Sequence, residues 1–108
     1  MAANKWIGLL GLCRRAGQLE AGAFLTERAI RSGRAKLVLL AEDASDNTKK
    51  AINDACRYRR VPVVTVLGKT ELGHAVGLED RVCLCITGDS FAGQITKLLE
   101  KENKQSKE

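Results

Sequence analysis

The residues of this chain that could do chemistry are scattered, and they form no catalytic constellation. Glu42 and Asp43 follow the apolar run Lys36–Ala41, where a carboxylate pair suggests acid–base chemistry or a metal site. No histidine or cysteine accompanies the pair, so loop structure and helix capping explain it better. His74 has no nearby serine, cysteine or carboxylate motif of a nucleophilic triad. We expect a surface or half-buried histidine and a chain that is not an enzyme.

Four cysteines offer a second kind of chemistry, at Cys13, Cys56, Cys83 and Cys85. They lack the Cys-x-x-Cys spacing of a zinc site, and only His74 could add a nitrogen ligand. Each cysteine lies within an apolar pattern, where a free thiol behaves as a small hydrophobe. We therefore expect reduced core cysteines, with neither a metal nor a cofactor.

Residues 22–32 combine an aromatic ring with positive charge. On a helix of about 100° per residue, Phe24, Arg28 and Arg31 share one side. The opposite, mainly apolar side holds Leu25, Thr26, Ala29 and Ile30. A ring and two arginines at the start of a helix, where free N–H groups attract phosphate, suit RNA recognition by stacking and charge. The alternative is that Phe24 packs under the first helix or a loop, and periodicity does not separate the two.

The positive charge is concentrated in the first third of the chain. Residues 1–40 hold seven basic and two acidic residues, whereas residues 41–108 hold eleven of each, so the net charge of +5 lies before residue 41. Such a field favours polyanions such as nucleic acid. An ordinary solvated basic face is the alternative.

Length and patterning predict one α/β domain. The chain has 108 residues, of which 44% are apolar, enough for one core. We expect the domain over residues 1–102 and a polar, flexible tail over 103–108. No apolar run approaches the roughly 20 residues that span a membrane, and no signal-peptide pattern precedes Arg14 and Arg15. A cytoplasmic protein is expected.

Helical and strand patterns alternate along the chain. Helices are expected over residues 4–15 and 22–32. Three more are expected after the N-cap candidates Ser45, Thr70 and Asp89 or Ser90. Strands are expected over residues 18–20, 36–41, 61–66 and 82–87. This alternation predicts a three-layer α/β/α sandwich with a small mixed sheet.

Five segments resemble a known family. The run Gly22–Asp43 resembles the ribosomal protein superfamily of archaeal L7Ae and eukaryotic L30e, and Val61–Val63 and Leu72–Gly77 fit the same pattern at the right distances. Within that superfamily, Ile7–Gly17 and Glu42–Thr48 are most similar to the bacterial YlxQ-type proteins. The resemblance covers most of residues 15–90 and implies an α/β/α sandwich.

The resemblance also implies binding to kink-turns, in which an RNA duplex bends sharply at a bulge followed by tandem sheared G·A pairs. The kink makes accessible the base edges that A-form RNA hides. By position, Gly22 matches the glycine that opens the family's recognition helix, and Arg28 matches the lysine that contacts guanine. The expected site residues at the helix entrance are Gly22, Ala23, Phe24, Leu25 and Arg28. Further charge is expected from Arg31, Arg34 and Lys36.

The chain departs from the family pattern in two places. Phe24 and Leu25 stand where the family's well-known binders have Asn and Glu, so base-specific readout should be weaker or use backbone groups. The family's second RNA-contacting loop is matched by Leu78, Glu79, Asp80 and Arg81. Its two carboxylates would repel phosphate unless they point away or accept a bond from a base amino group.

Two functions follow as hypotheses. The first is a monomeric, non-enzymatic binder of structured RNA, either a kink-turn or ribosomal RNA. The second is a protein-interaction or ribosome-assembly module, in contact with the ribosome or ribosomal proteins, that has kept the fold and lost direct RNA affinity. Phe24 and Leu25 would then form a partner-facing apolar patch.

Overall fold

The computed structural model describes residues 5–106. The helices in that part of the chain are α1 (Lys5–Arg15), α2 (Ala23–Arg31), α3 (Asp46–Arg59), α4 (Lys69–Ala75) and α5 (Asp89–Ser106). The strands are β1 (Leu19–Ala21), β2 (Leu37–Ala41), β3 (Val63–Val66) and β4 (Cys83–Ile86). The elements follow one another as the sequence predicts, with bounds that differ by a few residues.

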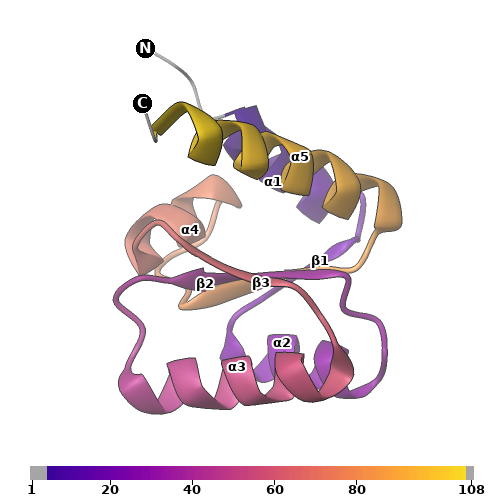
Figure 1. The fold of residues 1–108 in the computed structure, drawn as a ribbon, viewed down its shortest axis with the longest axis vertical. Coiled ribbons are helices and arrows are strands. Elements are labelled where there is room, and N and C mark those ends of the chain that lie inside the picture. The colour runs from indigo at the N-terminus through magenta and orange to yellow at the C-terminus, as the bar shows by residue number, and fades with distance from the viewer. Residues whose placement is uncertain (1–4, 107–108) are drawn as a thin grey trace.

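The sheet is mixed and is covered on both faces. Its strand order is β1-β4-β2-β3, with β2 and β3 parallel and β4 antiparallel to both of its neighbours. Helices α2 and α3 cover one face, and α1, α4 and α5 cover the other (Figure 1). The predicted three-layer α/β/α sandwich is therefore confirmed.

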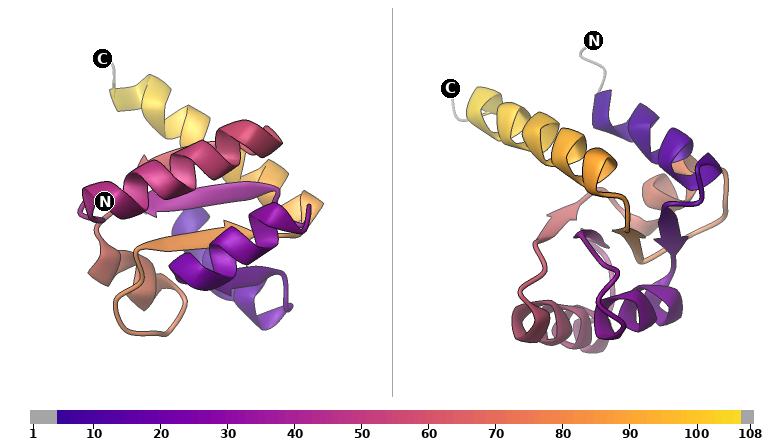
Figure 2. Two further views of the ribbon diagram at one scale, coloured as in Figure 1. Left: turned by 90° about the horizontal axis from the view of Figure 1, so that it is seen from below. Right: turned by 90° about the vertical axis from the view of Figure 1, so that its right-hand side faces the viewer.

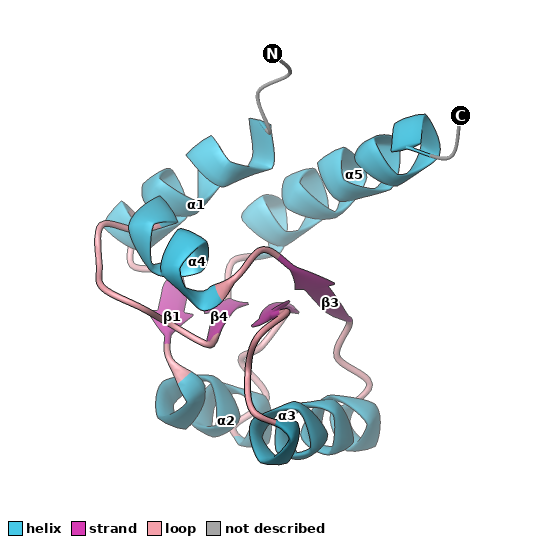
Figure 3. Ribbon diagram, turned by 90° about the vertical axis from the view of Figure 1, so that its left-hand side faces the viewer, coloured by secondary structure: helices cyan, strands magenta, loops and turns pink. Residues whose placement is uncertain are grey.

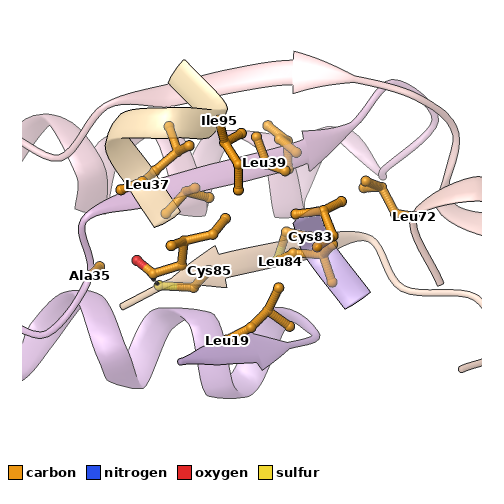
Figure 4. Packing of buried hydrophobic residues seen from close by; sticks show 14 of the residues in the cluster. Leu19, Ala35, Leu37, Leu39, Leu72, Cys83, Leu84, Cys85 and Ile95 are labelled. Atoms are coloured by element: carbon orange, nitrogen blue, oxygen red, sulfur yellow. Dashed lines mark hydrogen bonds between the residues drawn. The ribbon is translucent and has the colours of Figure 1, made fainter. Parts of the chain in front are cut away.

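The core forms around β2 and β4, the two inner strands. Every residue of both strands is buried, as expected of strands covered on both faces. Figure 4 shows Leu37 and Leu39 of β2 beside Ile95 of α5, with β4 running between them and Leu19. The continuous apolar run that predicted β2 thus marks the centre of the molecule.

Strand direction decides which ends of the helices meet. Strands β1, β2 and β3 run the same way, since β4 is antiparallel to both β1 and β2 and β2 is parallel to β3. The chain passes from the carboxyl ends of these three strands into α2, α3 and α4. The N-termini of these helices therefore lie along one edge of the sheet, the edge formed by those strand ends. Helices α2 and α3 run side by side in the same direction, and their C-terminal ends lie at the opposite edge (Figures 1 and 2).

Two helix starts test the capping predictions. The Ser45 hydroxyl accepts a hydrogen bond from the N–H of Thr48 at 3.1 Å, which confirms Ser45 as the N-cap of α3. Thr70 was expected to cap α4, and this is wrong because α4 begins at Lys69. The Lys69 N–H instead donates to Oδ1 of Asp43 at 2.9 Å, across 26 residues of sequence. The loop carboxylate therefore caps a distant helix.

Helices α1 and α5 join the two ends of the described chain. Trp6 is buried, and its Nε1 donates to Oε2 of Glu102 at 3.2 Å. Helix α5 extends to Ser106, four residues beyond the expected end of the domain. Helices α1 and α5 lie on the side of the sheet opposite α2 and α3 (Figure 1). No helix within residues 5–106 is long and apolar enough to cross a membrane.

Candidate nucleic-acid interface

The backbone at Gly22 sets the start of α2. Gly22 has φ 104° and ψ 161°, a conformation almost restricted to glycine. Its N–H donates to the carbonyl of Cys83 at 2.8 Å, which fixes this turn to β4. No side chain caps α2, so the N–H groups of its first turn, including that of Ala23, stay open to an external acceptor. This is the geometry by which a helix start binds phosphate.

The side chains of the first turns of α2 face solvent. Phe24 is 72% exposed, so the alternative that it packs under a helix or loop is wrong. Leu25 was placed on the core side and is 37% exposed, because the buried side of α2 is formed by Thr26, Ala29 and Ile30. Arg28 is exposed, and it has no ion pair or side-chain hydrogen bond within the described residues. An aromatic ring and an unpaired guanidinium therefore lie next to open N–H groups.

Residues 78–81, between α4 and β4, lie at the same edge of the sheet as Gly22. A Cβ on Gly22 would lie 3.7 Å from Cδ of Arg81, so the loop and the start of α2 are neighbours. Figure 3 views this edge, with α4 above the sheet and α2 below it. A hollow of about 510 Å³ is lined by His74, Gly77, Leu78, Glu79 and Arg81. The two predicted RNA-contacting segments thus meet in space.

The charges of this loop are partly satisfied within the protein. Nη1 of Arg81 donates to the carbonyls of Glu79 and Asp80, at 3.2 and 2.8 Å. Oδ1 of Asp80 accepts from the Thr70 hydroxyl at 2.9 Å. Leu78 is half-buried against the core, and Glu79 is exposed. The Asp80 carboxylate is thus held by α4, and both Glu79 and Asp80 remain exposed to solvent.

Gly73 positions the same loop, and the sequence analysis missed it. Gly73 is a buried residue of the short helix α4. A Cβ at this position would collide with the backbone of Glu79, and the Leu78 N–H bonds to the Gly73 carbonyl at 2.8 Å. The signal was a glycine inside a helical pattern, which usually marks a close packing contact.

Three predicted basic residues lie elsewhere. Arg31 is the last residue of α2, and Arg34 and Lys36 follow it, at the edge of the sheet away from Gly22. Each has an acidic partner: Arg31 with Glu27 at 3.2 Å, Arg34 with Glu20 at 3.3 Å and Lys36 with Asp89 at 3.7 Å. These three residues therefore lie apart from the group around Gly22. Their positive charges, which were expected to supply charge to the RNA site, are each paired with a carboxylate.

The other residues that could do chemistry are His74 and the four cysteines. His74 is exposed on α4, as expected. All four cysteines are buried and unbridged, in agreement with the predicted core thiols. Burial raises the pKa of Cys13 and Cys56 to about 11 and that of Cys85 to about 12. These thiols are therefore protonated at neutral pH. Within residues 5–106, no three His, Cys, Asp or Glu side chains gather closely enough to hold a metal ion.

Comparison with known families agrees with this arrangement. The model of the ribosomal protein L7Ae/L30e/S12e/Gadd45 family matches residues 4–97. The chain belongs to this family. The family is non-enzymatic, which confirms the expectation that the chain is not an enzyme.

Relatives within the L7Ae/L30e/S12e/Gadd45 family match over nearly their whole length. The RNA-binding protein YlxQ of Bacillus subtilis is 43% identical over 100 residues, which cover 93% of this chain and all of that protein. The protein of the same name from Enterococcus faecium is 38% identical over 97 residues, with 90% and 93% of the two chains covered. The expected similarity to YlxQ-type proteins is thus confirmed.

Two solved structures share the fold. A protein of unknown function from Bacillus halodurans superposes with a TM-score of 0.86 at 35% identity, over 91% of this chain and 99% of its own. A 15.5 kD RNA-binding protein of Giardia lamblia superposes with a TM-score of 0.73 at 22% identity, over 94% and 90% of the two chains. At that identity the second match supports the fold alone.

Proposed function

We propose that this chain binds structured RNA, and that it recognises kink-turn-like elements in ribosomal or regulatory RNA. The observation that carries the proposal is the meeting of the start of α2 with residues 78–81 at one edge of the sheet, through Gly22 and Arg81. The names of its relatives in Bacillus subtilis and Enterococcus faecium, both RNA-binding proteins, point the same way. The protein would act in the cytoplasm as a monomer of one RNA-binding domain.

The start of α2 suits a kinked duplex. Open N–H groups of the first turn, together with the positive end of the helix dipole, would bind phosphate oxygens. The exposed Phe24 ring offers a surface on which a base released from the stack can lie. Arg28, one helical turn further on, can donate two hydrogen bonds to O6 and N7 of guanine. Recognition of this kind depends on the shape of the kink as well as on sequence.

Residues 78–81 would bind the other side of the kink. Residues 78–81 carry two carboxylates against one guanidinium, and Arg81 is turned onto its own loop, so the loop is net negative and does not attract phosphates. Glu79 is exposed and can accept a hydrogen bond from a base amino group. The loop is therefore suited to base edges, whereas α2 supplies the phosphate contacts.

A titration against two RNAs tests the proposal. The probes are a standard kink-turn RNA and a control duplex of equal length in which the G·A pairs are replaced. We expect tighter binding of the kink-turn, and a loss of about tenfold or more for Arg28→Ala, because a bidentate guanine contact contributes about 1–3 kcal/mol. The matched control is Lys97→Ala on α5, which removes one positive charge from the opposite layer and should change affinity little.

A second candidate rests on the exposure of Phe24 and Leu25, at 72% and 37%. Two exposed apolar side chains at a helix start also suit a protein partner, such as a ribosomal protein. Salt separates the two functions, because RNA affinity falls steeply as salt rises and an apolar protein contact does not. Equal, weak binding to both RNAs, unchanged in Arg28→Ala, would contradict kink-turn recognition and favour the protein partner.

A further inference from the structure

We propose that the C-terminal end of α3 is a second RNA contact, which takes an unpaired nucleotide on Tyr58 and the neighbouring phosphates on Arg59 and Arg60. We call Arg57, Tyr58, Arg59 and Arg60 the α3-end surface. The inference rests on the proposed RNA-binding function, but it concerns an edge of the sheet that the kink-turn site does not use.

The first observation is the exposure of Tyr58. At 83% it is the most exposed of the large hydrophobic side chains in the part of the chain that the structure describes, ahead of Phe24 at 72%. The guanidinium of Arg59 lies over its ring, with Cζ 5.7 Å from the ring centre. An aromatic face with an arginine beside it is the arrangement on which single-stranded nucleic acids stack. Neither side chain contributes to the core.

The second observation is the backbone of Arg60. It is the one non-glycine residue with positive φ in the described chain, at φ 59° and ψ 44°. The Val61 N–H bonds to the Cys56 carbonyl at 2.8 Å, six residues apart counting both, which is the helix end at which glycine is normally found. An arginine here is less favourable for folding than a glycine. Such a residue is a candidate for a functional contact.

The third observation is the distribution of charge at this edge. Arg59 and Arg60 have no ion pair or side-chain hydrogen bond within the described residues, and Arg57 lies 3.6 Å from Asp54. Basic side chains at a helix C-terminus also interact with the helix dipole, which accounts for charge at the end of α3. The dipole does not account for the exposed ring, nor for a side chain at the left-handed position. A polyanion accounts for all three.

The position of the α3-end surface defines which RNA can reach it. Helices α2 and α3 run in the same direction, so this surface and Gly22 lie at opposite ends of the α2–α3 layer (Figure 2). Helix α3 has 14 residues, which gives a length of about 21 Å. Because a base must be unpaired to stack on Tyr58, a kink-turn bound at Gly22 would reach this surface through a single-stranded extension.

The test uses the full chain and four RNA probes. These are a blunt-ended kink-turn, two versions of it with a ten-uridine extension on one strand or on the other, and free ten-uridine RNA. We expect one of the extended probes to bind about tenfold more tightly than the blunt probe. Tyr58→Ala should remove that difference and leave the blunt probe unaffected, whereas Tyr58→Phe should keep it, because the ring remains. A variant that loses one phosphate contact, such as Arg60→Gly, should show a less steep fall of log affinity with log salt. The magnitude of that slope should decrease by about 0.7.

Arg60→Gly separates a binding role from a structural one. Because glycine fits the left-handed position better, we expect the variant to melt about 4 °C higher than the original protein and to lose affinity for the extended probe only. Lys97→Gln on α5 is the control for loss of one charge, and it should leave both probes unaffected.

The two proposals can fail separately. Equal affinity for the blunt and extended probes, with no effect of Tyr58→Ala, would overturn the α3-end contact and leave kink-turn binding in place. Binding of free ten-uridine RNA that needs Tyr58, without preference for the kink-turn, would support this contact and overturn the proposed kink-turn recognition.

Discussion

The glycine inside α4 gives the sharpest test of how residues 78–81 are held. Replacing a helix-interior glycine by alanine normally stabilises a protein by about 1 kcal/mol. Gly73 should show the opposite sign, because the new Cβ would collide with the backbone of Glu79, which cannot turn away as a flexible side chain would. Forcing a methyl group into such a contact costs about 1–3 kcal/mol.

The expected result for Gly73→Ala follows from these two terms. With a clash near the upper limit and a helix gain of about 1 kcal/mol, we expect a net loss of about 2 kcal/mol in the free energy of unfolding. For a domain of this size the melting temperature should fall by roughly 8 °C. The loop would also move away from Gly22, so kink-turn affinity should decrease in the folded variant.

The matched control is Gly93→Ala in α5. Gly93 is also helical and exposed, and a Cβ there meets no atom within 4 Å. This variant should gain about 1 kcal/mol and bind RNA normally. Unfolding can be followed through the fluorescence of Trp6, the single tryptophan, which is 2% exposed. If Gly73→Ala is stabilised as much as Gly93→Ala, the loop is not held by this contact and the reasoning is refuted.

Two further predictions concern the cap and the thiols. Asp43→Ala should lower the free energy of unfolding, measured in urea, by about 1 kcal/mol, because the Lys69 N–H loses its acceptor. Asp43→Asn should retain most of the stability. Equal losses in the two variants would contradict a capping role. Stability should fall as pH rises above 9, because unfolded thiols ionise there while burial holds the pKa of Cys13, Cys56 and Cys85 near 11 or 12. Urea midpoints at pH 8 and 10 check this, and Cys56→Ala should reduce the pH dependence.

Local patterns predicted the elements well, because these patterns report burial directly. The run that became β2 is apolar throughout, and every residue of it is buried. Ser45 caps α3 through a contact only three residues away, which a sequence pattern can show. Helical periodicity also put Thr26, Ala29 and Ile30 on the buried side of α2, although it left open whether Phe24 is exposed. These predictions depend on near neighbours in the chain.

Predictions that depended on distant partners were less successful. Charge counting treated Arg34 and Lys36 as free, but their partners Glu20 and Asp89 come from other elements. Thr70 matched a capping pattern, and Asp43 took that role from 26 residues away. Counting charges along the sequence also placed all the excess positive charge before residue 41. In the fold, the C-terminal ends of α2 and α3 lie at the same edge, although α2 precedes residue 41 and α3 follows it.

The pairing of α1 with α5 has a practical consequence for measurement. The bond between Trp6 and Glu102 keeps the first and last helices together on the side of the sheet opposite α2 and α3 (Figure 1). A fluorophore or sensor-chip linker attached to an exposed residue of α5, such as Lys97, would therefore lie across the sheet from the α2–α3 layer that carries Tyr58. Immobilised protein would present both edges to dissolved RNA in the same orientation, so surface-based kinetics should report the affinities found in solution.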